Sequence, residues 1–130
     1  MALSANKNRK IAYNTTPRTT CRMELDTGVT AYVGAILQHT AAGNKAELAD
    51  DSRQVIGIAS EYGVAGDTII IEAGQYERFT FTGAALGDIG KAVYPVDDET
   101  VTTTAGTNVV GYIVDVPATN TVLVHVTTHA

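Results

Sequence analysis

Apolar and polar residues alternate along several short segments of the chain, beginning at residue 29. Successive side chains of an extended strand point to opposite faces, so such alternation predicts strands with one buried face. Residues 29–37 follow this pattern. In residues 76–82 it places Glu77, Phe79 and Phe81 on one side, and the two phenylalanines mark that side as the core side.

Two further segments are apolar on both faces. Residues 54–62 read QVIGIASEY, and residues 68–73 contain three consecutive isoleucines. Strands of this kind are expected where both faces of a sheet are covered. Gly57 predicts a β-bulge or a close approach of two main chains. Shorter patterns predict strands at residues 45–49, 91–96, 100–104, 109–116 and 121–128.

The residues between these segments are rich in Gly, Asn, Asp and Pro, which favour turns. Strands that recur roughly every 8–12 residues with turns between them are typical of an antiparallel sandwich or barrel. A single helical turn is expected at residues 84–86. The 130 residues are 45% hydrophobic and contain no Trp and two Phe, so one core of mainly Val, Ile, Leu and Ala is expected. The predicted fold class is all-β, a small antiparallel barrel or sandwich.

Residues 1–28 differ from the rest, because they are polar and sustain neither a helical nor a strand period. We therefore divide the chain into an extended basic N-terminal arm, residues 1–28, and a β body, residues 29–130. Ile11, Tyr13, Met23 and Leu25 are isolated apolar residues in this arm. Such residues suit a segment that becomes ordered when it docks on a partner.

The charge of the chain is strongly asymmetric. Residues 1–23 carry five basic residues and no acid, whereas the remainder carries four basic and fourteen acidic residues, so charges of +5 and −10 make up the net −5. A basic segment can bind nucleic acid through its phosphates. The acidic body opposes such docking, so a protein surface of opposite charge is the favoured partner and direct nucleic-acid binding is not expected.

The sequence offers few groups for catalysis. His39, His125 and His129 do not have a metal-ligand spacing with Cys or acidic residues, and each is expected at the surface. Cys21, the only cysteine, excludes an internal disulfide and has no nearby His to activate it. No serine lies in a nucleophile-elbow pattern. We therefore expect no enzyme activity.

Neither of two possible ligand motifs fits its pattern. Residues 87–91 read GDIGK, but the residues around them do not complete a phosphate-binding loop, and a turn is expected there. The acidic residues 97–99 and 50–51 lack the spacing of a calcium loop, and both are expected to be solvated turns. No cofactor or metal is predicted. The sequence also lacks a secretory signal and a membrane-length apolar stretch, so synthesis in the cytoplasm without membrane contact is expected.

The order of turns and core segments over about residues 29–127 resembles the small capsid decoration (cement) proteins of tailed bacteriophages. The resemblance lies in a VIGIA strand, a Gly-Asp turn, an isoleucine strand, a GDIGKAVY segment, a Thr-rich strand and a closing GYIVDV. In this chain they are residues 55–59, 66–67, 69–71, 87–94, 100–104 and 111–116.

This resemblance implies a β-tulip-like barrel that binds the outer surface of an assembled, expanded bacteriophage head, commonly as a homotrimer. It implies that the major capsid protein is the partner, that the protein is located in the virion, and that it bridges capsid subunits through an extended terminal arm. Charge and apolar anchors then select the capsid-binding residues: Lys7, Arg9, Lys10, Ile11, Tyr13, Arg18, Arg22, Met23 and Leu25.

Two alternatives stay open. The chain could be another phage structural module, such as a head fibre or a tail or receptor-facing protein. It could also be a small ligand-binding β-barrel or enzyme, which would need an enclosed pocket with convergent polar groups.

Overall fold

The computed structural model describes residues 3–6 and 19–127, which form antiparallel β-sheets. The first sheet consists, in spatial order, of β1 (Thr19–Glu24), β7 (Thr68–Ala73), β5 (Val55–Ala59), β3 (Ile36–His39) and β4 (Ala46–Leu48). The second sheet consists of β10 (Val101–Thr102), β9 (Ala92–Pro95), β11 (Gly111–Ala118), β12 (Thr121–Val126) and β8 (Tyr76–Thr80). The short strands β2 (Thr30–Ala31) and β6 (Gly63–Val64) pair separately, and η1 (Leu86–Asp88) is a 3-10 turn. The predicted all-β, antiparallel fold is confirmed.

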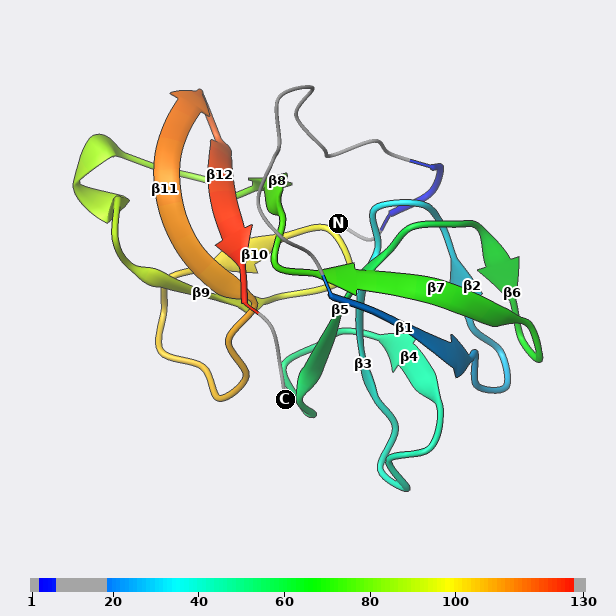
Figure 1. Cartoon of the computed structure of the whole chain (residues 1–130). Coiled ribbons are helices and arrows are strands. Elements are labelled where there is room, and N and C mark those ends of the chain that lie inside the picture. The colour runs from blue at the N-terminus through cyan, green and yellow to red at the C-terminus, as the bar shows by residue number, and fades with distance from the viewer. Residues whose placement is uncertain (1–2, 7–18, 128–130) are drawn as a thin grey trace.

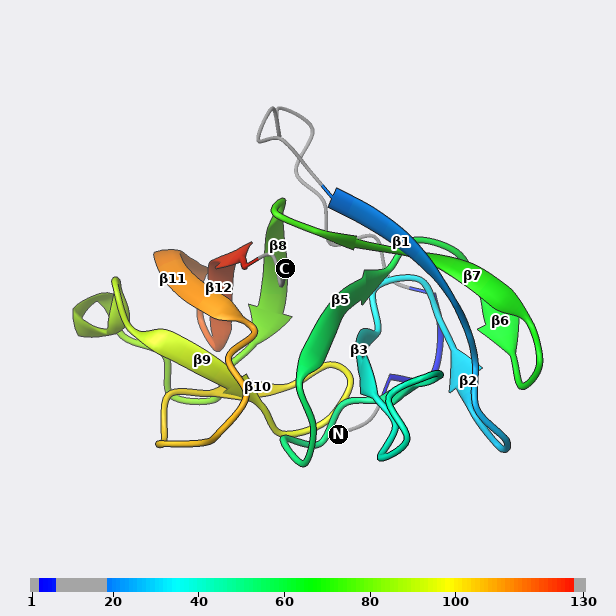
Figure 2. The same cartoon turned by 60° about the horizontal axis from the view of Figure 1, so that its bottom comes forward.

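The two sheets lie side by side, and the chain passes from β7 to β8 through a turn at residues 74–75 (Figure 1). In each sheet, an isolated parallel bridge links the chain at one edge strand to the chain at the opposite edge strand. Leu25, directly after β1, bridges Ala46 of β4, and Thr80 of β8 bridges Thr100, directly before β10. Both sheets therefore curl toward barrels, as the bending of β1, β7, β5 and β3 around one another illustrates (Figure 2).

The first sheet is covered on both faces. One apolar cluster joins residues of β3, β5 and β7 to the valines of the second sheet, and includes Ile36, Val55, Phe79 and Val124. The other cluster fills the hollow of the first sheet. Its buried members are Leu25, Ala31, Ala35, Leu37, Ala46, Ile56, Ala59, Ile69 and Ile71. Every residue of β5 is therefore buried, as expected for the middle of residues 54–62, whereas Gln54 and Tyr62 at the ends of that range are exposed.

The alternation in residues 29–37 does not form one strand. β2 ends at Ala31 and β3 begins at Ile36, and the N–H of Ala35 donates to the carbonyl oxygen of Tyr32 at 3.0 Å. Gly34, between them, has a φ of 97°, which glycine adopts without the steric cost of a Cβ. A turn at this glycine interrupts the predicted strand.

Part of the predicted arm belongs to the body. β1 pairs with β7 along its whole length, from Thr19 opposite Ala73 to Glu24 opposite Thr68. Its residues are exposed except Met23, which is half-buried. Cys21, Met23 and Leu25 alternate with Arg22 and Glu24, but this alternation is short and lies within the polar, basic first part of the chain. The body therefore begins before the boundary expected after residue 28, because residues 19–24 already form a strand of the first sheet.

Gly57 allows β5 to bulge and to approach β7 closely. Leu37 pairs with Gly57 but Gln38 pairs with Val55, so Ile56 is the extra residue of a bulge. A Cβ on Gly57 would overlap the main-chain oxygen of Glu72 in β7. Both features predicted from this glycine, a bulge and a close approach of two main chains, are confirmed.

We expect Gly57→Ala to lower the free energy of unfolding by about 1–3 kcal/mol or more, because the Glu72 main chain cannot move without disturbing the sheet. Gly87→Ala is the matched control, since a Cβ there meets nothing within 4 Å. Urea denaturation of both variants measures the difference. An equal effect of the two substitutions would contradict the close approach.

Candidate functional site

Residues 3–6 are docked on the body by contacts with distant parts of the chain. The N–H of Leu3 donates to Oδ1 of Asp98 at 2.9 Å. The N–H of Val33 donates to the side-chain oxygen of Asn6, also at 2.9 Å. The Leu3 side chain packs against the cluster that fills the hollow of the first sheet. These three contacts define a docking site for the N-terminal segment, which we call the N-terminal slot.

Six of the nine predicted capsid-binding residues lie outside the described residues. They are Lys7, Arg9, Lys10, Ile11, Tyr13 and Arg18. Their segment, residues 7–18, is preceded by the docked Asn6 and followed by Thr19, the first residue of β1. The basic segment is therefore held to the body at both ends and does not begin from a free chain end.

The structure places the other three predicted residues on or next to β1. Arg22 is exposed, and Met23 is half-buried against the apolar hollow of the first sheet. Leu25 is only 1% exposed and belongs to that core. Leu25 is therefore inaccessible to a partner in this structure, and the prediction that it anchors the arm on a capsid is wrong. Its apolar side chain instead fills the core at the point where the first sheet closes.

Asp98 is the residue at this site that the sequence did not reveal. The acidic residues 97–99 were expected to form a solvated turn, but Asp98 is 1% exposed, and its Oδ2 has no hydrogen-bond partner among the described residues. Burial raises the pKa of Asp98, the nearby charges of Asp97 and Glu99 raise it further, and the hydrogen bond from Leu3 opposes them. The expectation was wrong for Asp98, since three consecutive acids do not indicate which of them faces inward.

We expect Asp98→Asn to raise the free energy of unfolding at neutral pH and to flatten its pH dependence. A group whose pKa is raised by folding contributes stability at low pH that is lost as the pH rises through its folded-state pKa. The asparagine keeps an acceptor oxygen for the Leu3 amide but carries no charge. Denaturation of wild type and variant between about pH 4 and pH 7 measures the change.

Asp97→Asn is the matched control with the opposite sign. Burial acts to raise the pKa of Asp97, but hydrogen bonds, among them those from the amides of Glu99 and Thr100, hold it below its usual value. Its stabilising contribution is present at neutral pH and is lost on acidification, so this variant should be less stable than wild type at neutral pH. If the two variants behave alike, the buried position of Asp98 is wrong.

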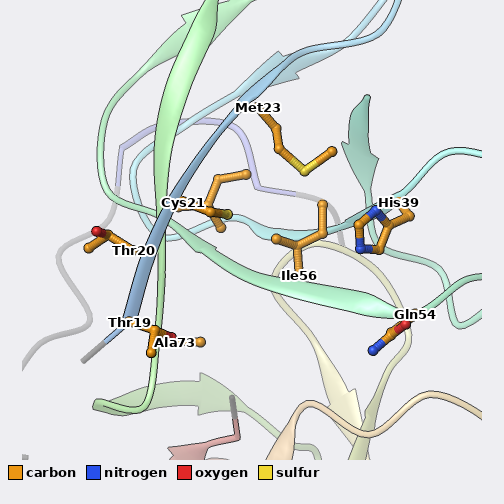
Figure 3. A pocket seen from close by; sticks show the side chains of 9 residues that line it. Thr19, Thr20, Cys21, Met23, His39, Gln54, Ile56 and Ala73 are labelled. Carbon is orange, nitrogen blue, oxygen red and sulfur yellow. The ribbon is translucent and has the colours of Figure 1, made fainter. Parts of the chain in front are cut away.

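A cavity of about 370 Å³ opens beside β1 at one end of the first sheet (Figure 3). Cys21 and Met23 enter it from β1, whereas Ile56 and His39 lie on its other side. Its remaining lining residues are Thr19, Thr20, Gln54, Ile71 and Ala73. The cavity exists because β1 meets β4 only beyond its end, at the bridge from Leu25 to Ala46, and leaves the inward face of Cys21 uncovered.

The polar groups of this cavity do not form a nucleophile and base. Partial burial of the Cys21 thiol raises its pKa, which lowers the fraction of reactive thiolate at neutral pH. His39 is half-buried instead of fully at the surface, and within residues 3–6 and 19–127 its Nδ1 has no hydrogen-bond partner. The cavity is mainly apolar, with threonines, an imidazole and an amide at its rim.

We expect Cys21 to react with iodoacetamide more slowly at neutral pH than a cysteine in an unstructured peptide, although the residue is exposed. The rate should rise with pH to a midpoint above that of the peptide, because the folded protein raises the thiol pKa. Mass spectrometry of the modified chain provides the measurement. A midpoint at or below that of the peptide would show that the thiol does not face the cavity.

A second polar group lies at the junction of β7 and β8. Gln75 is fully buried, and its amide nitrogen donates to Oε1 of Glu77 at 2.9 Å. Glu77, on the side of β8 expected to face the core, is 1% exposed. His125 contacts the carbonyl oxygen of Gly74 through Nε2 at 3.0 Å and stacks on Tyr76. These contacts fix the turn between the two sheets and give His125 a structural role instead of a free surface position.

Within residues 3–6 and 19–127, no three His, Cys, Asp or Glu side chains gather closely enough to hold a metal ion. The same residues contain no helix with the length and apolar character needed to span a membrane.

Comparison with known proteins gives no assignment. No family model matches the chain, and no curated protein matches it significantly.

Proposed function

We propose that this protein is a capsid decoration protein that binds the outer surface of an assembled bacteriophage head and bridges capsid subunits. The observation that carries the proposal is the separation of charge along a chain with this pattern of strands and turns. A basic segment, residues 7–18, is tethered at both ends to an acidic β body. The resemblance of the sequence to phage cement proteins supplies the specific role.

Electrostatics support a protein surface as the partner. Lys7, Arg9, Lys10 and Arg18 are not interrupted by any acid, and Arg22 adds an exposed charge on β1. Such a segment accelerates docking on an acidic surface and selects against basic ones. Ile11 and Tyr13 are the apolar anchors within residues 7–18. Leu25, which lies outside this segment, is excluded as an anchor by its burial.

A protein that binds only the assembled shell stabilises it by linkage. The shell must lose the free energy of binding before it can come apart. A homotrimer that assembles only on the head would multiply weak contacts into avid binding. The exposed side chains of Tyr112 and Val114 on β11 offer apolar area for contacts between copies. The protein would then be located in the virion, with the major capsid protein as its partner.

The test is to mix the purified protein with expanded, undecorated heads of the phage that encodes it, and to examine them by cryo-electron microscopy. We expect density in a lattice pattern over the head. Density confined to a fibre or the tail would favour another phage structural role, and heads without added density would overturn the proposal.

Replacement of Lys7, Arg9, Lys10 and Arg18 by alanine should weaken binding to heads by on the order of tenfold or more, since exposed ion pairs contribute about 0.2–1 kcal/mol each. The matched control replaces Arg53 and Lys91, two bases of the body, by alanine and should bind nearly as tightly as wild type. A sedimentation assay at two salt concentrations gives both affinities. If the arm variant binds as tightly as wild type, the basic segment has no role in docking.

The cavity beside β1 favours a second candidate, a small ligand-binding barrel. Its volume of about 370 Å³ lies at the lower end of the range for small-ligand sites. A bound ligand would protect Cys21 from iodoacetamide and raise the melting temperature. A screen of small apolar compounds with these two readouts tests this candidate independently of capsid binding.

A further inference from the structure

We propose that the N-terminal slot is an exchangeable site, which the residue 3–6 segment of a second copy of the chain can occupy in place of the molecule's own segment. The proposal goes beyond capsid binding and does not depend on it. It identifies an interaction surface between copies, formed by Asp98, Val33 and the apolar hollow of the first sheet.

The contacts in the slot do not depend on which molecule supplies the segment. Leu3 is 95 residues away from Asp98 in the sequence, and Asn6 is 27 residues from Val33, so sequence neighbours take no part in the docking. One contact is made by a main-chain N–H, one by an amide side chain and one by a leucine. An identical segment from a neighbouring copy can form the same three contacts, which is the condition for exchange of an element between protomers.

The linking chain is long enough for this exchange. Twelve residues, 7–18, connect the docked segment to β1. Fully extended they span about 40 Å. A body of this size has a radius of gyration of about 13 Å, so the segment can reach the equivalent slot of an adjacent molecule.

Charge favours a second copy as the occupant over an unrelated protein. The linking residues carry four positive charges and no acid, whereas residues 24–130 carry a net charge of −10. A linker that crosses to a neighbour therefore leads to an acidic body, and attraction between the two lowers the free energy of the exchanged state.

Concentration decides which copy fills the slot. A short covalent connection holds a molecule's own segment at an effective concentration of about a millimolar, so docking within one molecule prevails in dilute solution. Exchange prevails where copies are held side by side at a comparable local concentration. Neighbouring copies are then joined through their N-terminal segments.

The test uses two full-length variants that cannot dock within one molecule. Asp98→Ala keeps the segment but removes the acceptor from the slot, and Leu3→Asp keeps the slot but places a charge where the leucine packs. We expect each variant alone to be monomeric. Mixed in equal amounts at roughly a tenth of the millimolar effective concentration, they should form a dimer of one copy each, detected by analytical ultracentrifugation and native mass spectrometry.

A control mixture combines Leu3→Asp with the double variant Leu3→Asp/Asp98→Ala, which has neither a segment nor a slot to complete the pair, and it should stay monomeric. Circular dichroism establishes that each variant is folded. If Asp98→Ala does not fold, a synthetic peptide of residues 1–6 takes its place and should bind the Leu3→Asp variant, whereas the same peptide with Asp at position 3 should not.

Folded variants that stay monomeric when mixed, or a peptide that fails to bind, would overturn the exchange. Neither result would affect the proposed binding to heads, because no head is present in the experiment. A dimer that also forms in the control mixture would show that another surface joins the copies, and would likewise overturn the proposal.

Discussion

The first sheet must be covered on both of its faces, and most of the structure follows from this constraint. β5 and β7 contribute side chains to both apolar clusters, so they have to pair without leaving a gap. Successive residues of β5 enter different clusters because strand side chains alternate between faces. The lack of a Cβ on Gly57 leaves room for the main chain of Glu72. Because β5 and β7 occupy the interior of the sheet, β1 is left at its edge, where the cavity opens.

The sequence predicted the elements whose side chains report burial directly. The predicted strand at residues 68–73 is β7, and the strand predicted at residues 121–128 is β12, whose three valines are fully buried. The prediction of one continuous strand at residues 29–37 was wrong. A turn at Gly34 interrupts the strand without changing the alternation of apolar and polar residues in the sequence. The sequence pattern also missed β1, because the alternation of Cys21 and Met23 with Arg22 and Glu24 is short, and the pairing of the strand with β7 rests on main-chain hydrogen bonds.

The candidate site was likewise predictable from the sequence only in part. The segregation of basic residues into the first part of the chain could be counted from the sequence. The docking of residues 3–6 could not, because it depends on single hydrogen bonds to residues as distant as Asp98. That acid lies in the turn between β9 and β10, beside Ile36, whose N–H donates to the carbonyl oxygen of Asp98 at 2.9 Å.

The order of strands in the two sheets also bears on how the chain folds. β1 cannot pair until β7, more than forty residues later, has been synthesised, and β8 must wait for β12 over a similar separation. Contacts between residues so distant in sequence are characteristic of β proteins that fold in milliseconds to seconds. β1 therefore stays unpaired while more than forty further residues are synthesised, and during this interval its main chain is open to association with other chains.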